Sequence, residues 1–272
     1  MREVTDDAGR RVRVAERPER IITLAPNLTE IVYAVGAGAR LVGNTTYCDY
    51  PPEATRVAKV GDTLNPSIER IIALRPQLIL VSTSSQLETF TRQLDEQQIA
   101  VYVTDAHDLE GVFRSILAVG DLLGQKAEAE RVAGELRART EKIEGAVRSS
   151  PPLSVFYQLS AEPLYTAGRD SYITDLIRRA GGTSVTGDVP GAWPRYSDEA
   201  ALGSRPEAIV MATGGSMGEA NREVAAALKR SPAAQTGRII QINGDYLSRP
   251  GPRLVDGLEQ MARALHPEAF KQ

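Results

Sequence analysis

The apolar residues of this chain form short continuous runs that alternate with stripes at helical spacing. Runs such as Ile21–Leu24 and Leu78–Val81 are typical of strands buried in a parallel sheet. Apolar residues at three- and four-residue spacing between these runs indicate helices that pack on the sheet with one face. This alternation predicts an α/β fold with mostly parallel sheets.

The apolar pattern, together with the turn and capping residues, defines the expected strands and helices. A hairpin is expected around Asp7–Gly9, and the remaining strands are Ile21–Leu24, Leu41–Gly43, Val57–Gly61, Leu78–Val81, Val101–Val103, Ser154–Gln158, Ala208–Met211 and Ile239–Ile242. Helices are expected after caps at Asn27, Ser67 and Asp108, and over Phe90–Gln98, Tyr172–Ala180, Ser197–Leu202, Asn221–Leu228 and Pro252–Leu265. Asn27 is expected to cap its helix with Glu30 in capping-box position.

One stretch occurs twice. Ser67–Val81 aligns without a gap with Ser197–Met211, so that Glu69 matches Glu199 and Arg75-Pro76 matches Arg205-Pro206. A charged helical run over residues 124–148 lies between the two copies, with its apolar positions on one stripe, namely Ala129, Val132, Leu136, Ile143 and Val147. The sequence therefore predicts two Rossmann-like lobes, residues 1–123 and 149–272, joined by a single long helix over residues 124–148.

Composition narrows the function classes. The net charge is −3 and no Lys/Arg run is long enough to follow a phosphate backbone, so a nucleic-acid partner is not expected. Cys48 is the only cysteine, which excludes an intrachain disulfide. No apolar run approaches ~20 residues, and the first residues lack a signal-peptide core, so the expectation is a cytoplasmic protein or an exported one whose signal is absent from this sequence.

Catalytic motifs are not recognisable. The two histidines are His107 and His266, and there is neither a phosphate-binding loop nor a Gly-x-Ser-x-Gly elbow. His107 follows a strand and could face a cleft or cover a helix N-terminus. A histidine- or metal-based enzyme is therefore not expected, and no cofactor or resident metal is assigned.

Aromatic residues carry most of the functional signal. Tyr47, Tyr50, Tyr165, Trp193 and Tyr246 all fall in expected loops beside Pro or Gly. Such rings at strand ends would form flat apolar walls with a polar tip, suited to a large planar ligand. The alternative is that they only pack loops onto the lobes.

The repeated Ser-x-Glu sites allow two interpretations. Ser67 and Ser197 can cap helices, and Glu69 and Glu199 favour the positive end of a helix dipole. Capping does not explain a carboxylate at the matching place of each lobe. Two such carboxylates on a common face would form a two-point dock for basic residues of a partner.

Several segments resemble those of one transport class. Residues 6–10, 18–26, Thr29-Glu30 and Leu74–Pro76 are similar to the substrate-binding proteins of ABC importers for cobalamin, haem and iron-siderophores. Residues 47–54, Trp193-Pro194 and Gly244–Tyr246 resemble the cobalamin-binding branch. The resemblance implies two lobes joined by a rigid helix, a corrinoid ligand and no catalysis.

The same resemblance implies residue roles. Tyr47 and Trp193 would stack on or edge the corrin and Asp245 would meet its amide side chains, and the other ligand contacts expected are Tyr50, Tyr165, Tyr246 and Arg249. Glu69 and Glu199 would seat the lobes on arginines of the permease. The protein would act as a monomer in the periplasm or as a lipid-anchored protein on the outer face of the cytoplasmic membrane.

Alternatives remain open at this point. Thr63 and Ser82-Thr83 stand near positions where cobalamin binders place tryptophans, so the ligand could be a smaller or differently shaped chelate. A haem-binding relative would use Tyr47 or His107 as axial ligand, and a siderophore binder would use arginines such as Arg249 and Arg169. A third possibility is an enzyme or assembly factor on the same scaffold.

Overall fold

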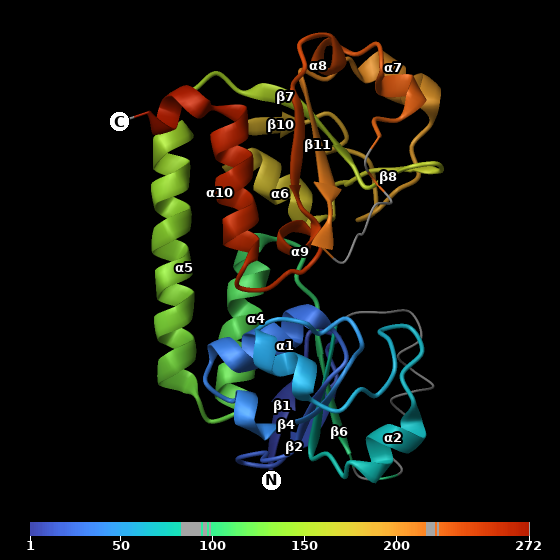
Figure 1. Ribbon diagram of the computed structural model, residues 1–272. Coiled ribbons are helices and arrows are strands. Elements are labelled where there is room, and N and C mark those ends of the chain that lie inside the picture. The colour runs from blue at the N-terminus through green and yellow to red at the C-terminus, as the bar shows by residue number, and fades with distance from the viewer. Residues whose placement is uncertain (83–93, 95–96, 98, 216–220, 222, 272) are drawn as a thin grey trace. The chain divides into compact units, whose positions relative to one another are not determined.

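The protein folds into two compact units, and helices α4 (Leu109–Leu122) and α5 (Lys126–Val147) each have residues in both. The computed structural model describes residues 1–82, 94, 97, 99–215, 221 and 223–271. Unit 1 comprises Met1–Ala106 and Gly111–Glu135, and unit 2 comprises His107–Glu110 and Leu136–Gln272. Helix α5 (Lys126–Val147) begins in unit 1 and ends in unit 2 (Figure 1).

Unit 1 is built on a four-stranded parallel sheet with the order β4-β3-β5-β6. Its strands are β3 (Ile21–Thr23), β4 (Leu41–Asn44), β5 (Leu78–Ser82) and β6 (Ala100–Thr104), with an antiparallel hairpin of β1 (Arg2–Thr5) and β2 (Arg11–Val14). Its helical segments are α1 (Pro26–Ala34), α2 (Ile68–Ala73), α4 (Leu109–Leu122), which starts in unit 2, and the short 3-10 turns η1 (Gly38–Arg40) and η2 (Pro52–Arg56). A core of buried aliphatic residues joins α2 to the sheet through Ile71, Ile22, Ile79 and Val81.

Unit 2 repeats the parallel architecture with the order β10-β7-β11-β12. Its strands are β7 (Leu153–Gln158), β10 (Gly182–Ser184), β11 (Ala208–Thr213) and β12 (Ile239–Asn243), with a hairpin of β8 (Ser160–Ala161) and β9 (Leu164–Tyr165). Its helical segments are α6 (Tyr172–Arg179), α7 (Asp198–Ser204), η4 (Ala226–Leu228), α8 (Pro232–Gln235), α9 (Gly244–Leu247), α10 (Leu254–Leu265) and η5 (Pro267–Phe270). Two parallel four-stranded sheets confirm the predicted α/β class.

The two faces of the second sheet are covered by different helices. Alternate residues of β11 point to one face, where Ile209 and Met211 share a buried core with Ala201 of α7 and Ala233 of α8. Helix α10 packs on α6 and β12 (Figure 1). Along its outer side, Arg139 of α5 forms ion pairs with Asp256 and Glu259 of α10 at 2.8 and 3.1 Å.

The duplicated stretch adopts the same local structure in both units. Ser67 and Ser197 accept a hydrogen bond from the amide three residues later, and each thereby caps a short helix. Each helix is followed by an arginine in the left-handed region, Arg75 at φ 47° and Arg205 at φ 45°. The burial pattern of residues 71–80 is identical, position by position, to that of residues 201–210. The predicted repeat is therefore a repeat in three dimensions as well.

The side chain after each Arg-Pro pair ties the helix to the start of a strand. Gln77 Oε1 accepts from the amides of Glu19 and Arg20, at 2.6 and 3.2 Å. In unit 2, Glu207 Oε2 accepts from the amide and hydroxyl of Ser154, at 2.8 and 2.9 Å. These bonds join the segment after each short helix to the start of another strand of the same sheet.

The connecting helix has the predicted amphipathic character. The five apolar residues of its stripe, Ala129, Val132, Leu136, Ile143 and Val147, are all buried. Among its charged residues, Arg131 pairs with Glu128 and Glu135 on the exposed side, each at 2.6 Å. No helix in the described ranges is long and apolar enough to cross a lipid bilayer.

Several local predictions are wrong. Asn27 does not cap α1, because Pro26 occupies the first turn, Ala25 is the N-cap, and Asn27 lies buried inside the helix. Residues 57–61 form no strand and make only isolated bridges, Asn44 with Lys59 and Gly61 with Pro66. The helix expected over Asn221–Leu228 is reduced to the 3-10 turn Ala226–Leu228. Most of the helix expected over Phe90–Gln98 lies outside the described residues.

Candidate ligand surfaces and docking helices

In unit 1 two exposed tyrosines share one short loop, residues 45–51, named here the tyrosine loop. Tyr47 is 52% exposed and Tyr50 is 45% exposed, whereas Cys48 between them is buried. The loop begins at the carboxyl end of β4, where the Cys48 amide donates to Thr45 O at 3.1 Å and Thr45 Oγ1 lies 3.1 Å from Cys48 Sγ. A buried turn thus presents two aromatic side chains to solvent.

Lys59 holds the tyrosine loop from beneath. Its Nζ donates to Asn44 Oδ1 at 2.8 Å, to Cys48 O at 2.9 Å and to Ala54 O at 3.2 Å. Burial lowers the pKa of Lys59, and the nearby Asp49 carboxylate acts in the opposite direction. One ammonium therefore crosslinks residues before, within and after the loop.

We expect Lys59→Met to loosen this loop. Removing the ammonium deprives three oxygens of a donor, which should lower the free energy of unfolding by about 1–3 kcal/mol. Urea unfolding of the purified protein measures this change. Lys142→Met, at an exposed position of α5, is the matched control and should change stability little. Equal stability of the two variants would show that Lys59 does not hold the loop.

In unit 2 the single tryptophan of the chain lies on two buried tyrosines. Trp193 is 37% exposed, and its ring centroid lies 5.6 Å from that of Tyr172 in an edge-on arrangement and 6.4 Å from that of Tyr157. Burial raises the pKa of both tyrosines, so both hydroxyls stay protonated at neutral pH. The indole is thereby held against a rigid support while part of it faces solvent.

The loop that carries Trp193 is pinned to the segment before α6. Thr166 N donates to Pro194 O at 3.2 Å and Gly168 N donates to Ala192 O at 3.0 Å, so the segment that follows Tyr165 runs beside the segment around Trp193. A Cβ atom at Gly168 would lie 2.3 Å from Gly191 O, which explains why glycine stands there. The prediction that Tyr165 and Tyr246 lie in loops is wrong, because Tyr165 lies half-buried in β9, with a backbone bridge to Arg195, and Tyr246 lies in α9.

Helix α9 is tied to the same platform. The hydroxyl of Tyr172 donates to Leu247 O at 3.0 Å, so the ring that supports Trp193 also holds the end of α9. Asp245 of α9 forms an ion pair with Arg249, which follows the helix, at 2.9 Å. The guanidinium of Arg253 lies over the ring of Tyr246, also in α9, at 5.5 Å from the ring centroid. Four of the predicted ligand residues, Trp193, Asp245, Tyr246 and Arg249, are thus linked through Tyr172 and the α9 turn.

Arg249 has a setting that the sequence did not suggest. Its residue exposure is 3%, and it pairs with Asp245 below the surface. This placement makes Arg249 a partner that orients the Asp245 carboxylate. A direct contact between Arg249 and a ligand stays a prediction.

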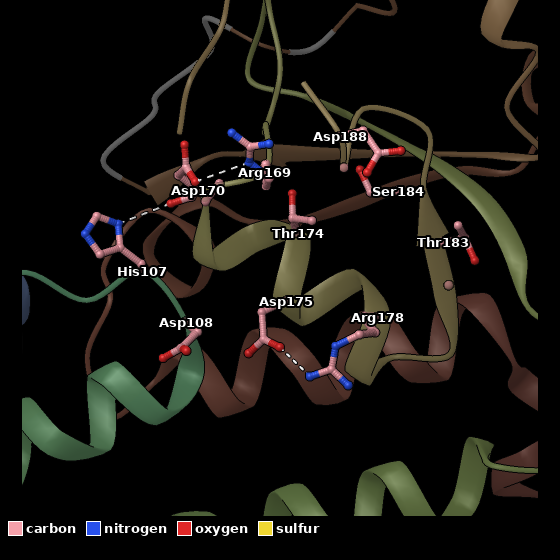
Figure 2. A pocket seen from close by; sticks show the side chains of 13 residues that line it. His107, Asp108, Arg169, Asp170, Thr174, Asp175, Arg178, Thr183, Ser184 and Asp188 are labelled. Atoms are coloured by element: carbon pink, nitrogen blue, oxygen red, sulfur yellow. Dashed lines mark hydrogen bonds and ion pairs between the residues drawn. The ribbon is translucent and has the colours of Figure 1, made fainter. Parts of the chain in front are cut away.

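His107 lies elsewhere, on the wall of a polar cavity of about 850 Å³ in unit 2 (Figure 2). Its Nδ1 lies 3.3 Å from Asp170 O. None of the other predicted ligand residues lines this cavity, while Arg169, the loose siderophore candidate, does.

Two residues that line the cavity, Asp175 and Arg178, belong to a charge network. Burial disfavours the Asp175 carboxylate, but hydrogen bonds from Arg179, the Leu109 amide and Arg178 lower the pKa of Asp175 below its usual range. Figure 2 shows Arg178 and Asp175 facing each other on α6. The network joins the start of α4 to α6, because the Leu109 amide donates to Asp175. In the described part of the chain, no three or more His, Cys, Asp or Glu side chains are placed to hold a metal ion.

The two predicted docking residues occupy equivalent, exposed positions. Glu69 is the second residue of α2 and Glu199 is the second residue of α7, both in the first helical turn. Each carboxylate is therefore placed by its own serine cap and its own sheet. The structure gives the same local geometry to both copies.

Residues 21–246 match the periplasmic binding protein family. The chain belongs to this family. This match, together with the substrate-binding relative described below, identifies the chain as a substrate-binding protein of an ABC importer, as the resemblance in the sequence predicted. The predicted transport class is therefore confirmed.

Individual relatives of this periplasmic binding protein span almost its whole length. An ABC transporter substrate-binding lipoprotein, YvrC of Bacillus subtilis, is 31% identical over 99% of this chain and 87% of its own length. A vitamin B12-binding protein of Pectobacterium atrosepticum is 31% identical over 91% of this chain and 88% of its own. The crystal structure of a periplasmic heme binding protein from Pseudomonas aeruginosa superposes with a TM-score of 0.81, at 27% identity over 92% of this chain and 93% of that one.

Three residues that support these surfaces were not identified by the sequence analysis of this family member. Tyr157 lies within an apolar strand and Tyr172 opens a helix, so both fit an ordinary core residue. Lys59 lies in a stretch predicted to be a strand. Only the packing of segments distant in sequence shows that these residues support Trp193 and the tyrosine loop.

Proposed function

We propose that this periplasmic binding protein captures cobalamin or a related corrinoid and delivers it to the permease of an ABC importer. The observation that carries the ligand proposal is the identity of its exposed apolar residues. Among the described residues seven large hydrophobic side chains are exposed, and three of them are Tyr47, Tyr50 and Trp193. Trp193 rests on two buried tyrosines, and the two tyrosine side chains flank the buried Cys48. Exposed apolar groups of this size often mark a ligand-binding surface.

The chemistry of these surfaces suits a large, flat, partly polar guest. Aromatic rings can stack on or edge a macrocycle, and the Asp245 carboxylate can accept hydrogen bonds from amide side chains such as those of a corrinoid. Arg249 forms an ion pair with that carboxylate and orients it. The vitamin B12-binding relative supports the same ligand class.

The proposed role involves binding and release without catalysis. The protein would act as a monomer outside the cytoplasmic membrane, in the periplasm or held by a lipid anchor, as the family and the lipoprotein relative suggest. Glu69 and Glu199 would seat the loaded protein on arginines of the permease.

Ligand retention tests the proposal directly. The purified protein is incubated in parallel with cyanocobalamin, hemin and a ferric hydroxamate, then desalted, and its visible spectrum is recorded. We expect only the corrinoid spectrum to be retained at one equivalent, together with quenching of the fluorescence of Trp193, the single tryptophan. Retention of hemin instead, the ligand class of the Pseudomonas aeruginosa neighbour, would overturn the corrinoid assignment and favour Tyr47 or His107 as its axial ligand.

A further inference from the structure

Two exposed apolar residues outside the ligand surfaces occupy equivalent positions of the repeat. Ile72 is 36% exposed and Leu202 is 53% exposed, and they lie at the same offset as Glu69 and Glu199. With the three aromatic residues removed, the exposed large hydrophobic residues in the described ranges are these two, Met1 and Leu64. Leu64 has no apolar aliphatic counterpart, because the position 130 residues later is Pro194.

Each of these residues shares a helix face with a docking glutamate. Ile72 follows Glu69 by three residues on α2, and Leu202 follows Glu199 by three residues on α7. Residues three apart on a helix are neighbours on its surface. Each unit therefore carries a carboxylate with an aliphatic side chain beside it.

The folded units do not need these side chains for their cores. Helix α2 is anchored by Ile71, which is fully buried, and α7 is anchored by Ala201, also fully buried. A single exposed aliphatic residue is ordinary on a protein surface. Two at the same place of a duplicated helix, each beside the residue assigned to docking, indicate a shared contact.

We propose that Glu69 with Ile72, and Glu199 with Leu202, form two copies of one docking element that the permease covers. The proposal rests on the docking role given above to the two glutamates. The matching surface on the permease would offer a guanidinium for the carboxylate and, directly beside it, an apolar hollow for the aliphatic side chain. The aliphatic contact excludes water from the ion pair, which strengthens the charge interaction.

The two copies are unequal. In unit 2 the helix starts with Asp198 before Glu199, whereas the corresponding residue of unit 1 is Ile68. Unit 1 instead has Arg70 directly after Glu69, where unit 2 has Ala200. Unit 2 thus presents more negative charge and a more exposed aliphatic side chain, so we infer that it contributes more to docking.

Serine replacements test the aliphatic half of the element. The full chain, loaded with cyanocobalamin, is prepared as Ile72→Ser, Leu202→Ser and the double variant, with Leu64→Ser as the matched control. Leu64 is 67% exposed and lies outside the repeat. Three quantities are measured for each variant: ligand affinity, thermal midpoint, and affinity for the cognate permease in nanodiscs.

We expect Leu202→Ser to weaken permease binding about tenfold or more, Ile72→Ser to weaken it less, and the double variant to be weakest. Ligand affinity and thermal midpoint should stay unchanged in all of them, and Leu64→Ser should bind the permease normally. Normal binding by the double variant, while Glu69→Ala/Glu199→Ala fails to bind, would overturn this inference and leave glutamate docking intact. Normal binding by the glutamate variant would instead overturn the docking role itself.

Two further outcomes also count against the inference. Equal loss of binding in Leu64→Ser would show that general surface hydrophobicity, not the repeated element, drives association. Sedimentation of the wild type as a dimer that Leu202→Ser converts to a monomer would assign the aliphatic residues to a second copy of the chain.

Discussion

Replacing Glu69 and Glu199 together with alanine is expected to abolish uptake while leaving ligand affinity unchanged. Both carboxylates lie in the first turn of a serine-capped helix and are exposed. Neither helix carries a predicted ligand residue. The variant should therefore capture its ligand and fail to deliver it.

The size of the effect follows from the energetics of interfacial charge pairs. Truncating one partner of a buried, hydrogen-bonded charge pair costs about 2–5 kcal/mol of binding free energy. The lower bound corresponds to about 30-fold in affinity for each glutamate, and two independent sites would together approach about 1,000-fold. The dissociation constant for the permease in nanodiscs and uptake of labelled ligand measure the loss.

A matched pair of acidic residues controls for net charge. Glu130 and Glu141 are exposed on α5, one in each unit, and Glu130→Ala/Glu141→Ala removes the same two charges. This control should retain docking and uptake. If it lost both to the same degree, overall charge and not the position of Glu69 and Glu199 would govern association. If the docking variant lost ligand affinity, the assignment of these residues to the permease would be wrong.

The fold was predictable because its signals are local and repeated. Apolar runs mark the parallel strands, and Ser67 and Ser197 cap helices as predicted because a hydroxyl can satisfy an amide of the first turn wherever the chain places it. The stripe of α5 was readable because helical spacing alone determines which residues share a face. Gap-free alignment of residues 67–81 with 197–211 indicated equal local structure, and both copies show it down to the left-handed arginines.

Predictions failed where neighbouring signals compete. Asn27 is a good cap residue, but Pro26 before it is equally suited to the first turn of a helix, and the helix starts at Pro26. Residues 57–61 have strand-forming composition, yet the side chain of Lys59 is engaged with the tyrosine loop and the segment makes only bridges. Such choices depend on contacts that a short window of sequence does not contain.

The sequence predicted the exposed aromatic residues of the candidate site but not the buried residues that hold them in place. Loop position beside Pro or Gly correctly marked Tyr47, Tyr50 and Trp193 as residues outside the core, and all three are exposed. Tyr172 is 21 residues from Trp193 in sequence and 75 from Leu247, and it contacts both. Burial of Arg249 against Asp245 likewise depends on the packing of the whole segment. Their roles as ligand residues stay predictions.

We expect Trp193→Ala to reduce corrinoid affinity about 30-fold. A tryptophan supported by two buried rings is pre-organised, so little conformational entropy is lost when a flat ligand packs on it. Truncation of such a residue at the centre of a binding surface costs about 2 kcal/mol or more. Isothermal titration calorimetry measures the change, since the variant lacks the only tryptophan and fluorescence cannot be used.

Two further variants separate ligand contact from support of the fold. Trp193→Phe keeps an aromatic face on Tyr172 and should recover most of the affinity. Phe270→Ala removes another aromatic ring of unit 2, one that packs against Arg263 near the end of α10, and should leave affinity unchanged. If Trp193→Ala bound the corrinoid like the wild type, the indole would serve only to hold its loop on Tyr157 and Tyr172, and the ligand would have to rest on other groups. The platform's geometry argues for contact, because an indole needed only for packing could be as buried as the two tyrosines beneath it, which are 1% and 9% exposed.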